Sequence, residues 1–167
     1  MKNIKIEIKW ALIFVVMMLA WMVMEKSLGW HDEKIADHAT MTNLVAIPSV
    51  AIYVFALLDK RKNFYHGVMS YYQGFMAGLL ITLIVAMLSP ISQYITSIFI
   101  TPDYFSNVTN YAVSTGEMTQ EKAESYFSLT SYMMMSVVGA LIMGIGTSAV
   151  VAVIVKSKSK PSALSSH

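Results

Sequence analysis

The chain has no cysteine, which excludes disulfide bonds, thiolate metal sites and cysteine nucleophiles. Charge is also scarce: only 13% of the 167 residues are charged and 56% are hydrophobic, whereas an average soluble chain is about 25% charged. This small number of charged side chains could not cover the surface of a soluble domain. The composition therefore indicates a protein that resides in a membrane. The formal net charge of +2 and the lack of long basic clusters argue against nucleic acid as a partner.

Sequence signatures of catalysis are missing as well. There is no GxSxG nucleophile motif, no glycine-rich phosphate loop and no dinucleotide fingerprint. The glycines at 139, 144 and 146 lie within an apolar stretch, where glycine commonly serves helix packing. We therefore expect a protein that is not an enzyme and that has no cofactor.

Four windows are free of charge, or nearly so, over a length that can cross a hydrocarbon core, for which about 20 helical residues are needed. They predict an all-α membrane protein, a single domain over residues 1–167, with four transmembrane helices. The expected spans are about 8–30, 42–58, 68–100 and 125–155. Pro48 lies inside the second window, so a kinked helix that starts near Thr42 is expected there.

The first window also has features of a signal peptide, because its apolar run Trp10–Met24 is only 15 residues long and follows three lysines. Glu25 and Lys26, however, separate this run from the small residues that a cleavage site would need. Lys9 can extend its side chain towards the interface and so lengthen the span. We therefore expect the segment to be retained as a membrane helix.

The basic residues are distributed unevenly between the two ends of these spans. Nine of the 12 lie on one side: Lys2, Lys5, Lys9, Lys60, Arg61, Lys62, Lys156, Lys158 and Lys160. Because lysine and arginine are enriched in cytoplasmic segments, this asymmetry predicts that both termini are cytoplasmic.

The segment at about 101–130 is predicted to form an extracytoplasmic helical hairpin between helices 3 and 4. Thr101-Pro102-Asp103 has the pattern of a helix start, with Thr101 as N-cap and a proline in the first turn. Gly116 would end the first helix. A second helix is expected to begin near Thr119 and to run directly into the fourth span.

One loop gathers residues that could hold a metal ion. His31, Asp32 and His38 lie close together in the sequence, and a spacing of seven would place the two histidines on one face of a helix. Imidazole and carboxylate groups suit zinc or iron, but no HExxH motif is present. The favoured interpretation is a solvated acidic loop without metal, with these three residues as weak candidates.

Small residues recur at helical spacing in two of the spans. One row consists of Gly74, Gly78 and Thr82, and the other of Ala140, Gly144 and Ser148. In lipid, such rows let helix backbones approach closely. Packing of spans three and four within one molecule is favoured, and homodimerisation or docking on another membrane protein remains the alternative.

Several sequence elements resemble one known family. They are Lys9-Trp10-Ala11, Ile47-Pro48-Ser49, Met69-Ser70-Tyr71, Gln73-Gly74-Phe75, Ser89-Pro90-Ile91 and Pro102-Asp103-Tyr104-Phe105. Together they resemble the bacterial "domain of unknown function 4199" family of small integral membrane proteins. The resemblance extends over nearly the whole chain. It implies location in a bacterial inner membrane and transfers no catalytic residue.

The function that these observations favour is that of a non-enzymatic interaction or accessory component of the membrane. Its expected partners are the lipid bilayer, a second copy or another membrane protein. A small-solute transporter or oligomeric channel is the alternative. Against ion-coupled transport, no ionisable residue is expected inside the spans, since Glu25 and His38 fall at outer ends. A metal-dependent enzyme that uses His31 and His38 is a weaker alternative.

Overall fold

The computed structural model describes residues 4–157 and is helical, without strands, over that range. The elements are α1 (Lys5–Ser27), α2 (Ile35–Met41), the 3-10 turn η1 (Thr42–Val45), α3 (Ala46–Asn63), α4 (Tyr71–Ile95), the π-helical turn η2 (Thr96–Ile100), α5 (Tyr104–Ser114), α6 (Gln120–Tyr126) and α7 (Leu129–Val155). The prediction of an all-α fold is confirmed for these residues.

Four helical segments are long and apolar enough to cross a membrane, which confirms the predicted number of spans within residues 4–157. They are α1, the continuous run from α2 to α3, α4 together with η2, and α7, with lengths of 23, 29, 30 and 27 residues. Each exceeds the length of about 20 residues that a span requires. Lys2, Lys158 and Lys160, which the charge argument included, lie outside the described residues.

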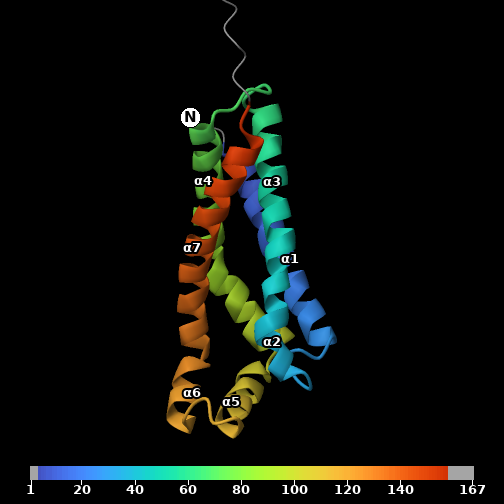
Figure 1. The fold of residues 1–167 in the computed structure, drawn as a ribbon, viewed down its shortest axis with the longest axis vertical. Helices are drawn as coiled ribbons and strands as arrows, with labels where there is room; N and C mark the ends of the chain where they lie inside the picture. Colours follow the sequence, from blue (N-terminus) through green and yellow to red (C-terminus); the bar gives the residue numbers. More distant parts are fainter. Residues whose placement is uncertain (1–3, 158–167) are drawn as a thin grey trace, which may run out of the picture.

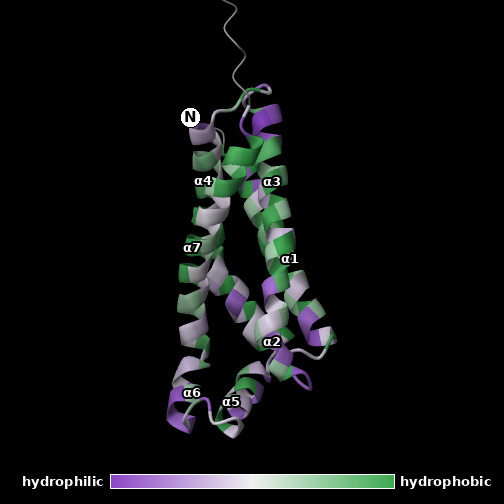
Figure 2. Ribbon diagram, in the orientation of Figure 1, coloured by the Kyte–Doolittle hydropathy of each residue, from purple (hydrophilic) through white to green (hydrophobic). Residues whose placement is uncertain are grey.

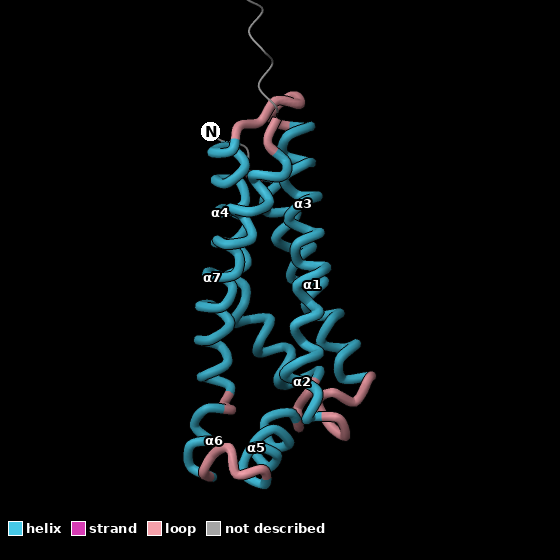
Figure 3. Tube along the Cα trace, in the orientation of Figure 1, coloured by secondary structure: helices cyan, strands magenta, loops and turns pink. Residues whose placement is uncertain are grey.

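The four long segments run alongside one another, and the loops lie at the two ends of the bundle (Figures 1 and 3). The loop between α3 and α4 lies at one end, where Arg61 donates a hydrogen bond to the Val155 carbonyl at the end of α7 (2.9 Å). At the same end, the Ser157 amide donates to the Met69 carbonyl (2.8 Å). The short helices α2, α5 and α6 lie at the opposite end.

Hydrophobic residues recur along the four long helical segments (Figure 2). Large side chains point away from the core on all three of the longest helical segments, for example Ile47, Met87 and Ile142, which are 70%, 78% and 65% exposed. Soluble monomers rarely expose so many large apolar side chains. The surface fits contact with lipid, as the composition predicts.

Proline lies inside both the second and the third span. The second span changes from α-helix to the 3-10 turn η1 just before Pro48, which lies in the first turn of α3. That the helix axis is kinked there stays a prediction. The span also begins earlier than Thr42, at Ile35. In the third span α4 continues through Pro90 to Ile95 and is extended by η2.

The segment at 101–130 also departs from the prediction. The N-cap of α5 is Asp103 rather than Thr101, whose hydroxyl instead donates to the Thr96 carbonyl at the end of the π-helical turn (3.2 Å). Helix α6 ends at Tyr126 and does not run into α7, because the Ser128 hydroxyl accepts from the Ser131 amide and starts a new helix. That this segment forms an extracytoplasmic hairpin stays a prediction.

Candidate functional site

The two rows of small residues face each other where α4 packs on α7, which is the most extensive helix contact in the described bundle. A Cβ atom built on Gly78 would lie 2.8 Å from the Cβ of Ser148, and one on Gly144 would lie 2.5 Å from the Cγ2 of Thr82. The Thr82 hydroxyl also lies 2.8 Å from the hydroxyl of Tyr53 in α3. Close approach of the backbones therefore takes place within one molecule.

The outer members of both rows have fewer close contacts. A Cβ on Gly74 would lie 3.4 Å from the Cβ of Ala152, and Ala140 packs against the edge of the buried core. Gly139 and Gly146, on the same helix as Gly144, have open space where a Cβ would be. The closest packing is thus confined to the central part of the helix pair.

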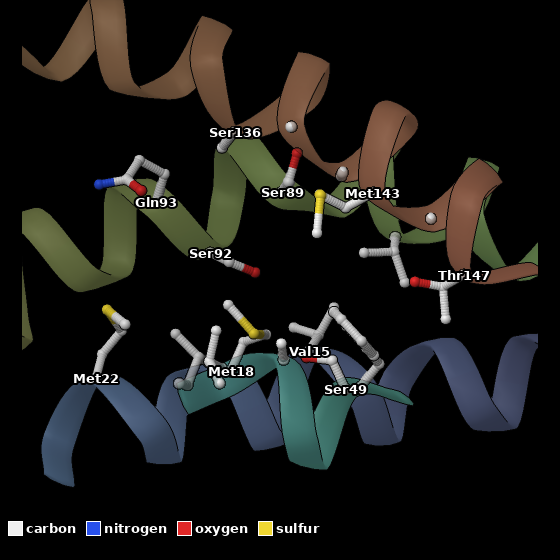
Figure 4. A pocket seen from close by; sticks show the side chains of 18 of the residues that line it. Val15, Met18, Met22, Ser49, Ser89, Ser92, Gln93, Ser136, Met143 and Thr147 are labelled. Carbon is white, nitrogen blue, oxygen red and sulfur yellow. The ribbon is translucent and has the colours of Figure 1, made fainter. Parts of the chain in front are cut away.

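A cavity of about 460 Å³ lies between α1, α3, α4 and α7. Figure 4 shows Met18 and Ser49 on one side pointing towards Ser92 and Met143 on the other. Its polar lining consists of hydroxyl and amide side chains: Thr42, Asn43, Ser49, Tyr53, Ser89, Ser92, Gln93, Thr96, Ser136 and Thr147. Its lining residues include no Asp, Glu, Lys, Arg or His. The cavity is therefore amphipathic and electrically neutral, and its volume is within the usual range of ligand pockets.

Pro90 explains why the helices separate around this cavity. A proline removes one hydrogen bond of the helix, and its ring pushes the carbonyl four residues earlier aside, which bends the helix. That carbonyl belongs to Ala86, and it accepts a hydrogen bond from the Ser89 hydroxyl instead (2.9 Å). Beyond the bend, α4 diverges from α7 and approaches the end of α1 (Figure 1). Ser89 and Ser92, on either side of Pro90, both line the cavity.

A second group of polar residues lies at the end of the bundle that carries α2 and α5. Helix α1 ends in a Schellman turn, in which the Trp30 amide donates to the Glu25 carbonyl (3.1 Å) and the Gly29 amide to that of Lys26 (2.9 Å). Gly29 adopts a φ of 78°, which glycine tolerates without strain. The turn folds the chain back so that His31 lies over the last turn of α1.

Glu25 is the centre of this group and is completely buried. Its Oε2 atom lies 3.0 Å from Nε2 of His31 and 3.5 Å from Nε2 of His38 in α2. Its Oε1 atom accepts a hydrogen bond from the Trp21 indole (2.6 Å). The hydroxyl of Tyr104 lies 3.3 Å from Nδ1 of His38. Burial raises the pKa of the Tyr104 phenol well above its usual value, so Tyr104 stays neutral.

The two histidines of this group could be predicted from the sequence as a pair, but its central residue, Glu25, could not. The structure brings His31 and His38 together, but His31 belongs to a turn and α2 begins only at Ile35, so the two do not share a helix face. Asp32 does not join them, since its carboxylate accepts from Asn107 (2.8 Å). For Glu25 the sequence predicts only a place at the outer end of the first span. Its position four residues after Trp21 is a signal that could have indicated the pair.

The opposite end of the bundle carries buried charge of a different kind. Glu7 and Lys60 form an ion pair of 2.8 Å, and both side chains are buried. Lys9 pairs with Asp59, whose carboxylate also accepts from the Trp10 indole (2.7 Å). That the membrane interior of the spans carries no ionisable residue stays a prediction, since Glu7, Lys60 and Glu25 belong to terminal parts of α1 and α3. All of these groups lie near helix ends and outside the cavity.

Comparison with known proteins gives one match. The model of the family described as "Protein of unknown function (DUF4199)" matches residues 9–157. The chain belongs to this family. Neither the curated proteins nor the solved structures yield a match. The predicted family is thus confirmed, and with four apolar spans this DUF4199 protein is a multi-pass membrane protein.

Proposed function

We propose that this DUF4199 protein resides in a bacterial inner (plasma) membrane with both termini in the cytoplasm. The described end that carries the α3–α4 loop is rich in basic residues, with Lys5, Lys9 and Lys156 beside the run 60–62. Lysine and arginine accumulate on the cytoplasmic side of bacterial membrane proteins. A reporter that is active only in the cytoplasm should be active when it is fused to the C-terminus. Activity of a fused reporter that works only in the periplasm would contradict the orientation.

Within that membrane, the protein acts by binding and not by catalysis, and it holds a neutral amphiphile between its four long helices. The observation that supports this proposal is the cavity, whose walls combine thioether and aliphatic groups with hydroxyl and amide groups. The apolar walls, such as Met18 and Leu19, suit an acyl or isoprenoid chain. The hydroxyls of Ser49 and Ser92 suit an alcohol, ester or carbonyl group at its end.

The neutral lining also selects against charged ligands. A charged head group that left water for this cavity would meet no counter-charge among the lining residues, and burial of an unpaired charge is strongly unfavourable. The same absence argues against ion-coupled transport through the cavity. Association with a second copy or with another membrane protein would use other surfaces than the central α4–α7 contact, because that contact is formed within the chain.

A matched pair of variants tests the binding proposal. Gly139→Leu adds a side chain where the cavity has open space, whereas Gly146→Leu adds the same side chain on the same helix at a glycine that does not line it. In lipid nanodiscs, wild type and Gly146→Leu are expected to bind tritiated 1-decanol saturably above the level of empty nanodiscs, and Gly139→Leu to lose this component. Equal binding by all three proteins contradicts the proposal.

A small-solute transporter is the second candidate, because the bend of α4 at Pro90 lies beside the cavity and interrupted helices are common at transporter binding sites. Proteoliposomes distinguish the two functions. Saturable binding without accelerated release of entrapped neutral solutes supports a binding protein. Release that depends on the protein and that Gly139→Leu blocks supports transport.

A further inference from the structure

The buried group at the outer end of α1 contains three potential metal ligands from three consecutive segments. Glu25 comes from the last turn of α1, His31 from the following turn and His38 from α2. One ligand atom from each side chain can be chosen so that all three lie within 4.8 Å of one another. This group is separate from the cavity lining, so it bears on a different property of the protein.

Two of the three distances between ligand atoms are close to those around a tetrahedral ion, and the third, between the two histidines, is within 4.8 Å. Zinc bound at about 2.0–2.1 Å in tetrahedral geometry places neighbouring ligand atoms about 3.3–3.4 Å apart. The two contacts of the Glu25 Oε2 atom, at 3.0 Å with His31 and 3.5 Å with His38, lie on either side of that value. Two imidazoles and a carboxylate are ligands that zinc and other first-row divalent metals accept.

The surroundings hold these ligands in the way that metal ligands are held in proteins. The Trp21 indole binds the carboxylate oxygen that faces away from the histidines, and the Tyr104 hydroxyl lies at the far nitrogen of His38. The Tyr104 hydroxyl in turn lies 3.3 Å from that of Tyr132 in α7. Outer contacts of this kind fix the orientation and the tautomer of metal ligands.

The charge of the buried carboxylate favours a bound cation. Among the described residues, the ion-pair partners of the fully buried Glu25 are the two histidines, which are charged only if protonated. The His31 residue is 97% buried, so its Nε2 atom beside Glu25 is shielded from bulk water, and its other ring nitrogen, Nδ1, is buried without a hydrogen-bond partner. A pocket of about 40 Å³ adjoins the group and is large enough for a water molecule; its lining includes His31 and the charged residues Lys26, Asp32 and Asp103.

We propose that Glu25, His31 and His38 form a binding site for one first-row divalent transition-metal ion, with zinc as the representative ion. The two imidazoles and the carboxylate supply three ligands, and water completes the coordination. The ion joins the end of α1 to the turn after it and to α2, and it neutralises the buried carboxylate. Asp32, which binds Asn107, is not a ligand.

Equilibrium dialysis against zinc, followed by elemental analysis, tests the site in detergent-purified protein that carries a tag without histidine. Wild type is expected to retain about one zinc per chain at saturation. His38→Gln and Glu25→Gln each remove one ligand and are expected to reduce the affinity for zinc at least about tenfold. Trp21→Phe removes a hydrogen bond to a ligand and is expected to reduce the affinity for zinc about 10–100-fold. The controls Asp32→Asn and His66→Asn should bind as wild type. His66 lies in the loop at the other end of the bundle and has a φ of 51°, which asparagine tolerates.

A second measurement covers the case in which a ligand variant fails to fold. Cobalt(II) added to the wild-type protein should produce the visible absorption bands of a four- or five-coordinate ion, and zinc should displace it. Zinc should also raise the Tm of wild type and of Asp32→Asn. Wild-type protein that retains no zinc and gives only the spectrum of hydrated cobalt overturns the proposal, and the three side chains then form a hydrogen-bonded group without metal.

Discussion

The contact between α4 and α7 allows a prediction about stability with built-in controls. Gly78→Ala would place a methyl group 2.7 Å from the Ser148 hydroxyl oxygen and 3.3 Å from the Ser148 Cα, and Gly144→Ala would place one 2.5 Å from Thr82. The methyl group would also lie 2.8 Å from the Ser148 Cβ, whose position is fixed by the backbone, so rotation of a side chain cannot remove the overlap at Gly78. The two helices must move apart. Gly139→Ala and Gly146→Ala meet nothing within 4 Å.

The expected magnitude follows from two opposing effects. Extra methyl groups in a packed contact destabilise by about 1–3 kcal/mol, whereas alanine is a better helix former than glycine by up to about 1 kcal/mol. The control variants gain only the second effect. For a chain of this size, 1 kcal/mol corresponds to about 2–4 °C in Tm, so Gly78→Ala and Gly144→Ala should melt at least several degrees below the two controls.

Thermal unfolding followed by circular dichroism in a mild detergent measures this difference. Size-exclusion chromatography of the same samples should show one unchanged oligomeric state, because the contact lies within the chain. If all four variants melt at the same temperature, the described packing of α4 on α7 is wrong. If Gly78→Ala alters oligomeric size without altering Tm, the small residues pack between molecules.

Three further variants test other parts of the structure. Lys60→Met removes the ion-pair partner of the buried Glu7 carboxylate and should lower the free energy of unfolding, measured by chemical denaturation, by about 3–5 kcal/mol. The double variant that also carries Glu7→Gln should regain most of this loss. An unchanged free energy of unfolding in Lys60→Met would contradict the buried ion pair. Ser89→Ala removes the hydroxyl that donates to the Ala86 carbonyl and should lower the free energy of unfolding by about 0.6 kcal/mol. In a background that carries Pro90→Ala, the Ala86 carbonyl regains its helical partner, so Ser89→Ala should have no effect there. Additive effects of the two substitutions would contradict this role of Ser89. Because burial raises the pKa of Tyr104, this phenol does not ionise in the folded protein up to about pH 10, and Tyr104→Phe should leave the ultraviolet titration of the tyrosines unchanged over that range. Above the unfolded pKa of about 10, only the unfolded wild type ionises Tyr104, so wild type should lose stability relative to Tyr104→Phe as the pH rises further.

The membrane spans could be predicted from the sequence because they depend on composition within single segments. A stretch such as 131–155 lacks charge over the width of a bilayer, and no tertiary contact is needed to recognise it. Helix boundaries were less accurate, since they depend on local capping. Ser128 starts α7 three residues after the predicted start of the fourth span, and the second span begins at Ile35, ahead of the predicted start near Thr42.

The group around Glu25 could be predicted only in part, because three separate segments build it. The composition of the loop after α1 indicates the two histidines as candidates. The position of His31, however, depends on the Schellman turn at the end of α1, and Tyr104 comes from α5. A charged residue that ends an apolar run is normally solvated, and apart from Trp21 four residues earlier the local sequence does not distinguish Glu25 from that case. The cavity is equally non-local, because it requires the bend at Pro90 together with three other helices.

Photolabelling tests the central claim, that a neutral amphiphile binds between the helices, most directly. Wild-type protein in liposomes would be irradiated with a diazirine derivative of 1-decanol, and the labelled residues identified by mass spectrometry. The account predicts saturable labels on cavity residues such as Met18, Ser49 and Ser92, which excess 1-decanol prevents and decyltrimethylammonium does not. Labels confined to lipid-facing residues such as Met87, at a level that neither competitor changes, would contradict it.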